Sequence, residues 1–428
     1  MITDLFLASI MCIFFFYGWT RPHVALSAVI WVDTLKPQTT SFSFLAGKPL
    51  SLIFTLFFFT VLFLNLKKVK IPKSKNYIFL ILFFMFWITL ATVHAEYQVV
   101  AWLKYDVVIK TLLFTFFIPF VVSTRQHLEL FISVLIISFG LFITMAGVKS
   151  AMGGGGYGVS LIGLGGFMYG EGSTLATLAI CVLPLIHFML KYSTLIKERP
   201  RFKYVLYFYI FCCLMVLIGT QARTGLVALG VYVILLLVQS KQKFKTLLII
   251  LIVPLLIKPF VTDDWLNRMN TIDEGATTEK SALGRIVVWR WTFDYVADKP
   301  FLGGGFFSYN ANAGILHLYQ QGEEIEIRQK GAKAFHNIYI EVLGETGYVG
   351  LAIFMCIIFQ SLLANRSTIN YHKKNKTKNS EWAIPFSRNI SQSLIIYCAG
   401  GMFIGVAFYP WMYYLHALSV AMKHIEDE

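Results

Sequence analysis

Long apolar runs, separated by short polar stretches, set the pattern of this chain. The runs are roughly 17–25 residues long, and a helix of about 20 apolar residues crosses the hydrocarbon core of a bilayer. The pattern predicts an all-α polytopic membrane protein of about twelve transmembrane helices, the last of which can divide at Pro410. The expected spans are approximately 4–19, 22–35, 49–66, 77–95, 106–122, 127–148, 172–191, 204–219, 223–239, 243–260, 338–363 and 391–421.

Composition supports the same class. Hydrophobic residues make up 57% of the 428 residues and charged residues only 14%, against about 25% charged in soluble domains, which excludes a water-soluble fold. The formal net charge of +14 would suggest a nucleic-acid partner in a soluble protein. Here the lysines and arginines gather in short loops between apolar runs, so we expect membrane lipids around the chain and no nucleic acid.

The basic loops give an expected orientation, because such loops face the cytoplasm under the positive-inside rule. Strict alternation of the spans places five basic stretches on that side: Lys67–Lys75, Arg125, Lys197–Lys203, Lys241–Lys245 and Lys373–Lys378. The outer side then receives 96–105, 149–171, Thr220–Arg223 and 262–336, with Met1 outside and Glu428 inside. The first span lacks a basic leader and a cleavage site, so we expect it to act as its own insertion signal.

The segment 262–336 is the only long stretch of ordinary polar composition. It is short and tethered at both ends. We therefore expect a single transmembrane domain, 1–428, in which 262–336 is an extracytoplasmic loop that carries short helices and caps the active-site cleft. The six cysteines fall in apolar runs without CxxC or metal-ligand spacing, and we expect no metal and no cofactor.

His336 stands where this segment meets the next span, directly before Asn337. A histidine at a boundary between water and membrane can titrate near neutral pH and accept a proton from a hydroxyl group. The competing interpretation, more common for an isolated histidine, is a residue that only caps the helix. The neighbouring pattern, which continues to Gly347 and Gly350, favours a functional role.

Arg223 lies between two spans with almost no polar loop around it. An arginine at membrane depth costs several kcal/mol unless it is paired or faces water, so it is a candidate for function. The alternative is an arginine whose long side chain reaches lipid headgroups. A guanidinium binds phosphate oxygens in a bidentate manner, and a pyrophosphate ligand therefore suits Arg223.

Two further arginines lie on a helix predicted within 262–336. Arg285 and Trp289 share one face at i and i+4, whereas Arg290 points about 140° away. Arg290 is as well explained by a solvated helix face as by function, and Arg285 is the stronger candidate.

Together these residues resemble the O-antigen ligase superfamily of bacterial membrane proteins, which includes lipopolysaccharide O-antigen ligases and protein O-oligosaccharyltransferases. Its pattern of His-Asn, nine residues and Gly-x-x-Gly is matched by His336-Asn337, Gly347 and Gly350. A second pattern, an arginine, three residues and a bulky apolar residue, is matched by Arg285 and Trp289. It leads into a Pro-x-x-Gly-x-Gly stretch at 300–305.

The resemblance extends to other parts of the chain. Arg223 is similar to the first essential arginine of the superfamily. The N-terminal part, with Arg21-Pro22-His23, Trp31 and Lys36-Pro37, resembles the exosortase-associated O-glycosylation ligases, although an acidic-Asn feature expected near Glu171 is missing.

By this resemblance the chain would be a GT-C-like glycosyltransferase of the bacterial inner membrane, with its active site facing the periplasm. Its donor would be a polyprenyl-pyrophosphate-linked glycan, and its acceptor a hydroxyl of a lipid A core or of an exported protein. The transfer would invert the anomeric carbon without a metal. The implied roles are proton acceptance by His336, pyrophosphate binding by Arg223, Arg285 and Arg290, and support from Asn337, Trp289, Gly347 and Gly350.

Two other functions stay open at this point. An O-antigen polymerase, whose acceptor is another lipid-linked glycan, shares the many spans and the outer arginines, but the complete His-Asn pattern favours a ligase. A transporter or flippase of lipid-linked sugars would need charged residues along a central pathway. The spans carry few charges, with Lys110 and Glu341 near span ends, so that function is poorly supported.

Overall fold

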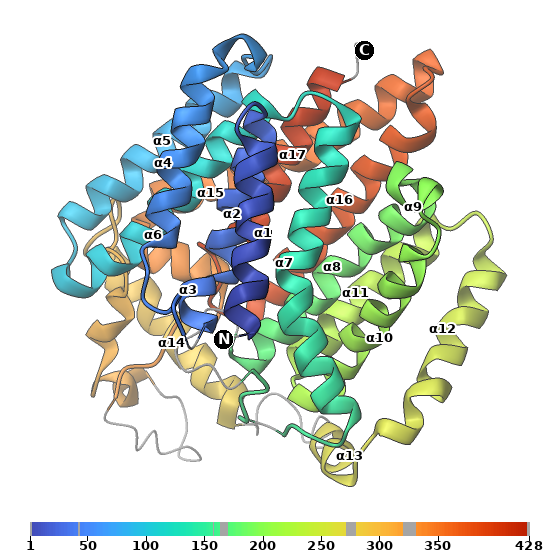
Figure 1. Ribbon diagram of the computed structural model, residues 1–428. Coiled ribbons are helices and arrows are strands. Elements are labelled where there is room, and N and C mark those ends of the chain that lie inside the picture. The colour runs from blue at the N-terminus through green and yellow to red at the C-terminus, as the bar shows by residue number, and fades with distance from the viewer. Residues whose placement is uncertain are drawn as a thin grey trace.

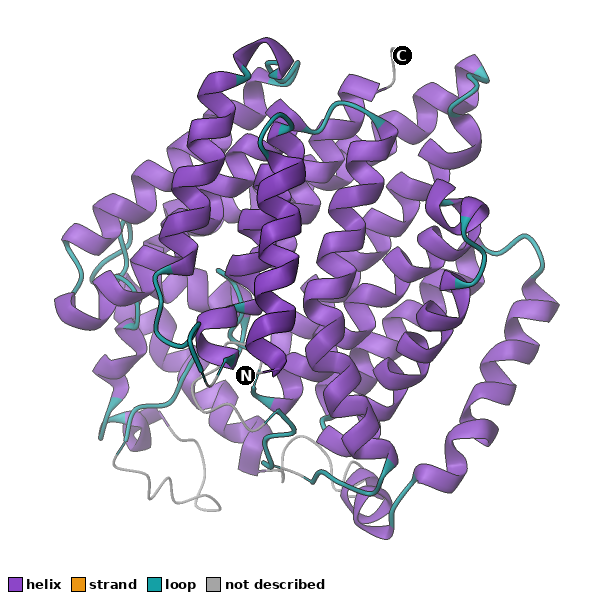
Figure 2. Ribbon diagram, in the orientation of Figure 1, coloured by secondary structure: helices purple, strands orange, loops and turns teal. Residues whose placement is uncertain are grey.

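The computed structural model of the chain describes residues 2–41, 43–156, 158–162, 170–270, 280–319 and 331–425. Within these residues the protein is all-α, with no strand (Figure 2), as the apolar pattern predicts. The α-helices are α1 Ile2–Gly18, α2 Pro22–Leu35, α3 Pro37–Thr40, α4 Leu50–Leu64, α5 Lys75–Val93, α6 Gln98–Val121, α7 Arg125–Ala151, α8 Gly172–Tyr192, α9 Thr194–Glu198, α10 Phe202–Thr220, α11 Arg223–Gln239, α12 Lys243–Ile257, α13 Asp263–Asn270, α14 Lys280–Ala297, α15 Ile338–Asn375, α16 Ser380–Gly400 and α17 Pro410–Ile425.

Five of the described helices, α5, α7, α8, α10 and α15, are long and apolar enough to cross a membrane. The full set of twelve spans therefore stays a prediction. Helix α6, for example, is 24 residues long but carries three charged residues, Lys104, Asp106 and Lys110, so it is not among the five helices selected by length and apolar composition. The expected span 391–421 divides at Pro410, as anticipated, into α16 and α17.

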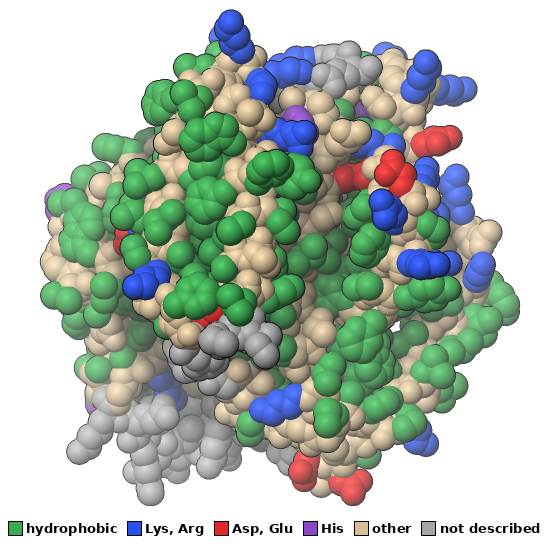
Figure 3. Space-filling view, in the orientation of Figure 1, with side chains coloured by type: hydrophobic (Ala, Val, Ile, Leu, Met, Phe, Trp, Pro, Cys, Tyr) green, Lys and Arg blue, Asp and Glu red, His purple; other side chains and the backbone are tan. Residues whose placement is uncertain are grey.

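The helices form one bundle whose two ends differ in chemistry (Figure 1). At the upper end lie the connections between α4 and α5, between α8 and α10, and between α15 and α16, where lysines and arginines gather on the surface (Figure 3). The opposite end carries α13 and α14. Large apolar side chains such as Phe16, Phe63 and Phe79 are exposed on the helices, as expected of a surface that lipid covers.

The centre of the bundle holds the last helix. Every residue from Trp411 to Met422 is buried in α17, and a helix that is apolar and buried all round belongs to the interior of a large protein. It packs against α6 and α15. Hydrogen bonds between His416 and Ser361 and between Ser419 and Asn365 join it to α15 inside this core.

The described parts of 262–336 include α13, α14, the loop 298–307 and two short 3-10 turns at Ser308–Asn312 and Leu316–Tyr319. They also include residues 332–336, which have no regular secondary structure and which we call the extended segment. Residues 271–279 and 320–330 lie outside the described structure, so the expected cap over the cleft stays a prediction. Trp291, Phe335 and Leu316 form a small apolar core that joins α14 to the extended segment.

Gly347 breaks α15 near its start. Its φ is +69°, in the left-handed region that glycine favours, and the break lets the glycine-rich stretch at 300–305 dock against the helix. Gly304 and Gly305 donate backbone hydrogen bonds to the carbonyls of Gly344 and Glu345, and Tyr348 donates one to Pro300. The matched Gly-x-x-Gly pattern therefore has a structural role in this chain.

Gly347→Ala should destabilise the protein strongly. An added Cβ would lie 2.1 Å from the carbonyl oxygen of Phe301, and alanine also pays for the left-handed backbone. Together these effects should cost about 2–5 kcal/mol, measured by unfolding in detergent. Gly230→Ala, which meets no atom within 4 Å, is the matched control, and equal stability of the two variants would contradict the account.

Candidate functional site

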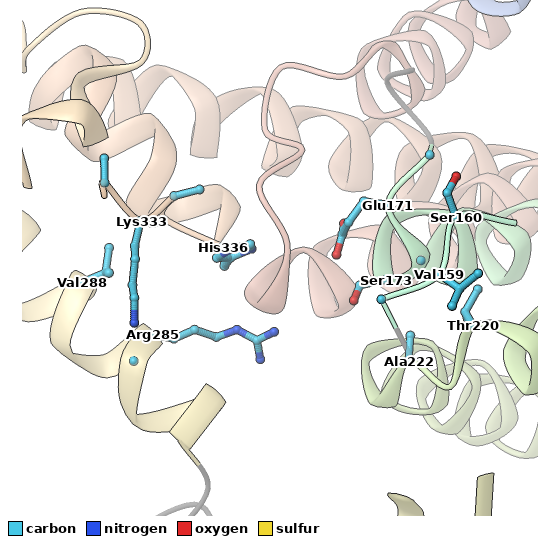
Figure 4. A pocket seen from close by; sticks show the side chains of 16 residues that line it. Val159, Ser160, Glu171, Ser173, Thr220, Ala222, Arg285, Val288, Lys333 and His336 are labelled. Carbon is cyan, nitrogen blue, oxygen red and sulfur yellow. The ribbon is translucent and has the colours of Figure 1, made fainter. Parts of the chain in front are cut away.

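A cavity of about 520 Å³ opens at the end of the bundle that carries α14, opposite the basic connections. We call it the His336 cavity. Arg285, Lys333 and His336 line one side, from α14 and the extended segment (Figure 4). Glu171, Ser173 and Thr220 line the other side, from the start of α8 and the end of α10. The cavity thus brings together Glu171 and His336, which are 165 positions apart in the sequence (336 − 171).

His336 is held from both directions along the chain. Before it, Phe335 is buried, and its carbonyl oxygen accepts a 2.9 Å hydrogen bond from the indole N–H of Trp289. After it, the side chain of Asn337 caps α15 by accepting hydrogen bonds from the backbone N–H groups of Tyr339 and Ile340. His336 itself has a φ of +47°, an uncommon conformation that the surrounding structure must maintain and that is often found at functional sites.

The surroundings lower the pKa of His336 from its usual 6.5. Burial is the largest cause, because it disfavours the charged imidazolium, and the positive charges of Arg285 and Lys333 act in the same direction. Glu171 and Glu341 oppose these effects and raise the pKa. His336 is therefore neutral at physiological pH, which is the form that can accept a proton.

Arg285 and Lys333 give the cavity its positive side. The guanidinium of Arg285 extends into the cavity, and Lys333 lies on the same side (Figure 4). The backbone of Lys333 is fixed by Asn312, whose side-chain amide donates to its carbonyl at 2.8 Å and accepts from its N–H at 2.9 Å. With His336 neutral, two cations face one carboxylate, that of Glu171, so the described part of the lining has a net positive charge.

Glu171 faces this positive side from across the cavity (Figure 4). Its Oε2 caps α8 by accepting hydrogen bonds from the backbone N–H of Thr174 at 3.2 Å and from the Thr174 hydroxyl at 2.5 Å. The start of α8 also carries the positive end of the helix dipole. The carboxylate is thus fixed in place while it lines the cavity.

The other predicted site residues lie elsewhere. Arg223 begins α11 beside Thr220 and Ala222, which line the cavity, but is itself absent from the lining. Its guanidinium donates a 2.9 Å hydrogen bond to the carbonyl of Arg268 in α13. Arg290 is exposed on α14 and likewise does not line the cavity. The structure therefore joins Arg285 to His336, and the pyrophosphate role expected of Arg223 and Arg290 stays a prediction.

Glu171 and Lys333 line the cavity but were not among the predicted site residues. Lys333 stands three residues before His336, and Glu171 directly precedes an apolar span with a threonine three residues later, which is the spacing of a helix cap. Both signals were therefore present in the sequence. Among the described residues no group of three or more His, Cys, Asp or Glu side chains is placed to bind a metal ion. The acidic cluster Glu323, Glu324 and Glu326, whose spacing in the sequence does not suit a metal site, lies outside the described residues.

Two protein families match the chain in turn. Residues 206–355 match the family described as O-antigen ligase, and this range contains Arg285 and His336. Residues 206–355 place this part of the chain in the O-antigen ligase superfamily, which its sequence patterns resemble. Residues 2–194, which contain Glu171, match a family of unknown function, DUF5935. The membrane character and the ligase-type family that the sequence predicted are thereby confirmed.

Two relatives from Rickettsia carry the name "putative polysaccharide ligase". The Rickettsia typhi protein is 26% identical over 161 residues, which cover 37% of this chain and 39% of that protein. The Rickettsia prowazekii protein is 26% identical over 125 residues, which cover 28% of this chain and 29% of that protein. The matched region thus spans less than half of the length of either superfamily relative.

Proposed function

We propose that this chain is a membrane glycosyltransferase that moves a glycan from a polyprenyl-pyrophosphate donor to a hydroxyl acceptor. The observation that carries the proposal is the His336 cavity, in which Arg285 and Lys333 face the same space as a neutral, fixed histidine. Membership of the O-antigen ligase superfamily supports the class of reaction. The acceptor is a hydroxyl of a lipid A core or of an exported protein.

In the proposed reaction, the hydroxyl oxygen of the acceptor forms a bond with the anomeric carbon of the donor glycan. The bond from that carbon to the pyrophosphate oxygen breaks, and the electron pair leaves with polyprenyl pyrophosphate. His336 accepts the proton of the attacking hydroxyl. Direct attack inverts the anomeric carbon. Arg285 and Lys333 stabilise the negative charge that grows on the leaving group, since fixed charges in a partly dry cavity do so better than water.

We place this reaction on the periplasmic side of the bacterial inner membrane. The basic connections gather at one end of the bundle and the His336 cavity lies at the other (Figure 1). Because basic loops face the cytoplasm, this arrangement supports an outer position for the cavity. Labelling of single cysteines introduced at Lys333 and Lys374 with a membrane-impermeant reagent tests the placement: only the first should react in intact spheroplasts, and the reverse would contradict it.

Transfer by the purified protein tests the proposed function. The protein in detergent is incubated with a polyprenyl-pyrophosphate-linked glycan, with EDTA, and with lipid A core or a Ser/Thr-containing exported protein as acceptor. Mass spectrometry should show acceptor that carries the glycan. Products in which the glycan is lengthened on the polyprenyl carrier would indicate a polymerase instead, and transport of the intact donor across vesicles without transfer would indicate a transporter.

The pH dependence of transfer should follow the charges around His336. Its lowered pKa means that activity should persist below pH 6.5 and fall only at lower pH, where the imidazole becomes protonated. Lys333→Gln removes a charge that lowers this pKa, so the acid limb of the kcat/KM profile, which reports the free enzyme, should move to higher pH. Glu171→Gln removes a charge that raises it, so the limb should move to lower pH. Shifts in the same direction would contradict the role of His336 as base.

A further inference from the structure

A second cavity, of about 480 Å³, lies on the other side of the extended segment that carries His336. We call it the Lys104 cavity. Its volume falls in the range of about 300–1,000 Å³ that small-molecule sites occupy. Its polar lining comes from distant parts of the chain and includes Lys36, Lys104, Tyr309, Glu341, Glu345 and Tyr409. Nothing in the proposed chemistry of the His336 cavity uses these residues.

Three of the four charged side chains that line the Lys104 cavity, Lys104, Glu341 and Glu345, form a largely buried ion cluster. The ammonium of Lys104 in α6 lies 2.7 Å from carboxylate oxygens of both Glu341 and Glu345 in α15. Only 16% of the Lys104 side chain is exposed, and less of either glutamate. Taking charged side chains out of water costs free energy even when they are paired, so this cluster needs an explanation beyond packing.

The balance of charge differs between the two cavities. In the Lys104 cavity, the two positive charges of Lys36 and Lys104 balance the two negative charges of Glu341 and Glu345, so the described lining is formally neutral. Among the described residues that line the His336 cavity, the cations outnumber the carboxylates. A pyrophosphate is therefore suited to the His336 cavity, whereas the Lys104 cavity suits a neutral ligand with many hydrogen-bonding groups.

Aromatic side chains complete the Lys104 cavity. Tyr309 and Tyr409 line it, and both are half-buried. Phe307 and Phe408 line it too, where the Lys104 ammonium lies 5.3 and 4.9 Å from their ring centroids. Aromatic rings offer apolar faces to the C–H groups of a sugar ring, while carboxylates and ammonium groups bind its hydroxyls.

The two cavities share a wall that is one chain segment thick. Ala334 lines both of them, and the side chain of His336 lines the first. A Cβ added at Gly405, which lines the Lys104 cavity, would lie 3.5 Å from Oε2 of Glu341 and 4.0 Å from the backbone nitrogen of His336. A ligand in the Lys104 cavity would therefore sit beside the residue proposed as the base.

From this juxtaposition we propose that the Lys104 cavity is a binding site for a neutral sugar residue next to the reacting groups. The inference deepens the proposed function and rests on it only for the origin of the sugar, which is either the acceptor or the glycan of the donor. Glu341 and Glu345, held by Lys104, accept hydrogen bonds from sugar hydroxyls. Tyr309 provides an aromatic face.

Binding of free sugars tests the site without any transfer. Saturation-transfer NMR of the full chain in detergent is recorded with the methyl glycosides of glucose, galactose, N-acetylglucosamine and N-acetylgalactosamine. At least one should bind, and Tyr309→Leu should weaken that binding about tenfold. Tyr309→Phe keeps the ring and should retain it. Tyr348→Leu, at an exposed tyrosine outside the cavity, is the matched control, and Lys36→Met tests a second element if Tyr309→Leu does not fold.

Absence of binding by all four glycosides, or binding that neither Tyr309→Leu nor Lys36→Met reduces, would overturn the inference. Sugar binding that persists in a protein without transfer activity would overturn the proposed function and leave the sugar site standing. In an active protein the origin of the sugar follows from the Michaelis constants. A KM raised about tenfold in Tyr309→Leu for the acceptor alone assigns the site to the acceptor, and one raised for the donor alone assigns it to the donor glycan.

Discussion

His336→Ala should reduce glycan transfer by about 10²–10⁴-fold, the usual contribution of a positioned acid or base. The imidazole borders the cavity beside Arg285, and its neighbours keep it neutral. Alanine cannot take the proton of the attacking hydroxyl, whereas Arg285 and Lys333 remain available to the pyrophosphate. We therefore expect the loss in kcat, with donor binding within about twofold of the wild-type value, measured by single-turnover transfer and by equilibrium binding of the donor.

The control for this prediction is His317→Ala. His317 is exposed on the turn Leu316–Tyr319 and does not line the cavity, so its removal should leave transfer unchanged. Full activity of a folded His336→Ala protein would remove His336 as the base. Equal losses in both variants would show that the effect is general to the outer region and not specific to the cavity.

Lys104→Met should destabilise the protein by about 3–5 kcal/mol, because it leaves the buried carboxylates of Glu341 and Glu345 without their cation. Glu341 also accepts a hydrogen bond from the backbone of Ala407 at 3.0 Å, and Glu345 accepts one from Phe307 at 2.9 Å. The cluster thus ties α6 and two outer segments to the first turns of α15. Unfolding of the variant in detergent measures the loss.

Two further variants separate the charge effect from packing. Combining Lys104→Met with Glu341→Gln and Glu345→Gln removes every unpaired charge and should restore most of the stability. Lys110→Met breaks an exposed pair with Asp106 on the same helix, which is worth only about 0.3–0.5 kcal/mol. If Lys104→Met were no more harmful than Lys110→Met, the buried cluster would not have the structural role described here.

The bundle was predictable from the sequence because the signal is local. Each apolar run is a property of consecutive residues, and the basic loops between runs report the two ends of the bundle. The break in α15 was not predictable in this way. Gly347 matched a family pattern, but only the structure shows that the backbone of Phe301 lies too close for any residue other than glycine. The division of 391–421 was readable because Pro410 favours the first turn of a helix.

The site was predictable only in part. Arg285 and His336 belong to recognisable patterns, and the structure brings them to one cavity. The ion cluster was not predicted, because Lys104 and Glu345 are 241 positions apart in the sequence. No local pattern indicates that two such distant charges meet. Arg223 lies between α10 and α11, where the sequence predicted it. The direction of its side chain depends on its hydrogen bond to α13, and no local sequence pattern predicts that contact.

The central claim, that the His336 cavity binds the lipid-linked pyrophosphate, is tested most directly by cryo-electron microscopy of the protein with a polyprenyl-pyrophosphate glycan. Density for the pyrophosphate should lie within hydrogen-bond distance of Arg285 and Lys333, with the first sugar beside His336. The same density in the Lys104 cavity, or at a site that involves neither Arg285 nor His336, would contradict the account.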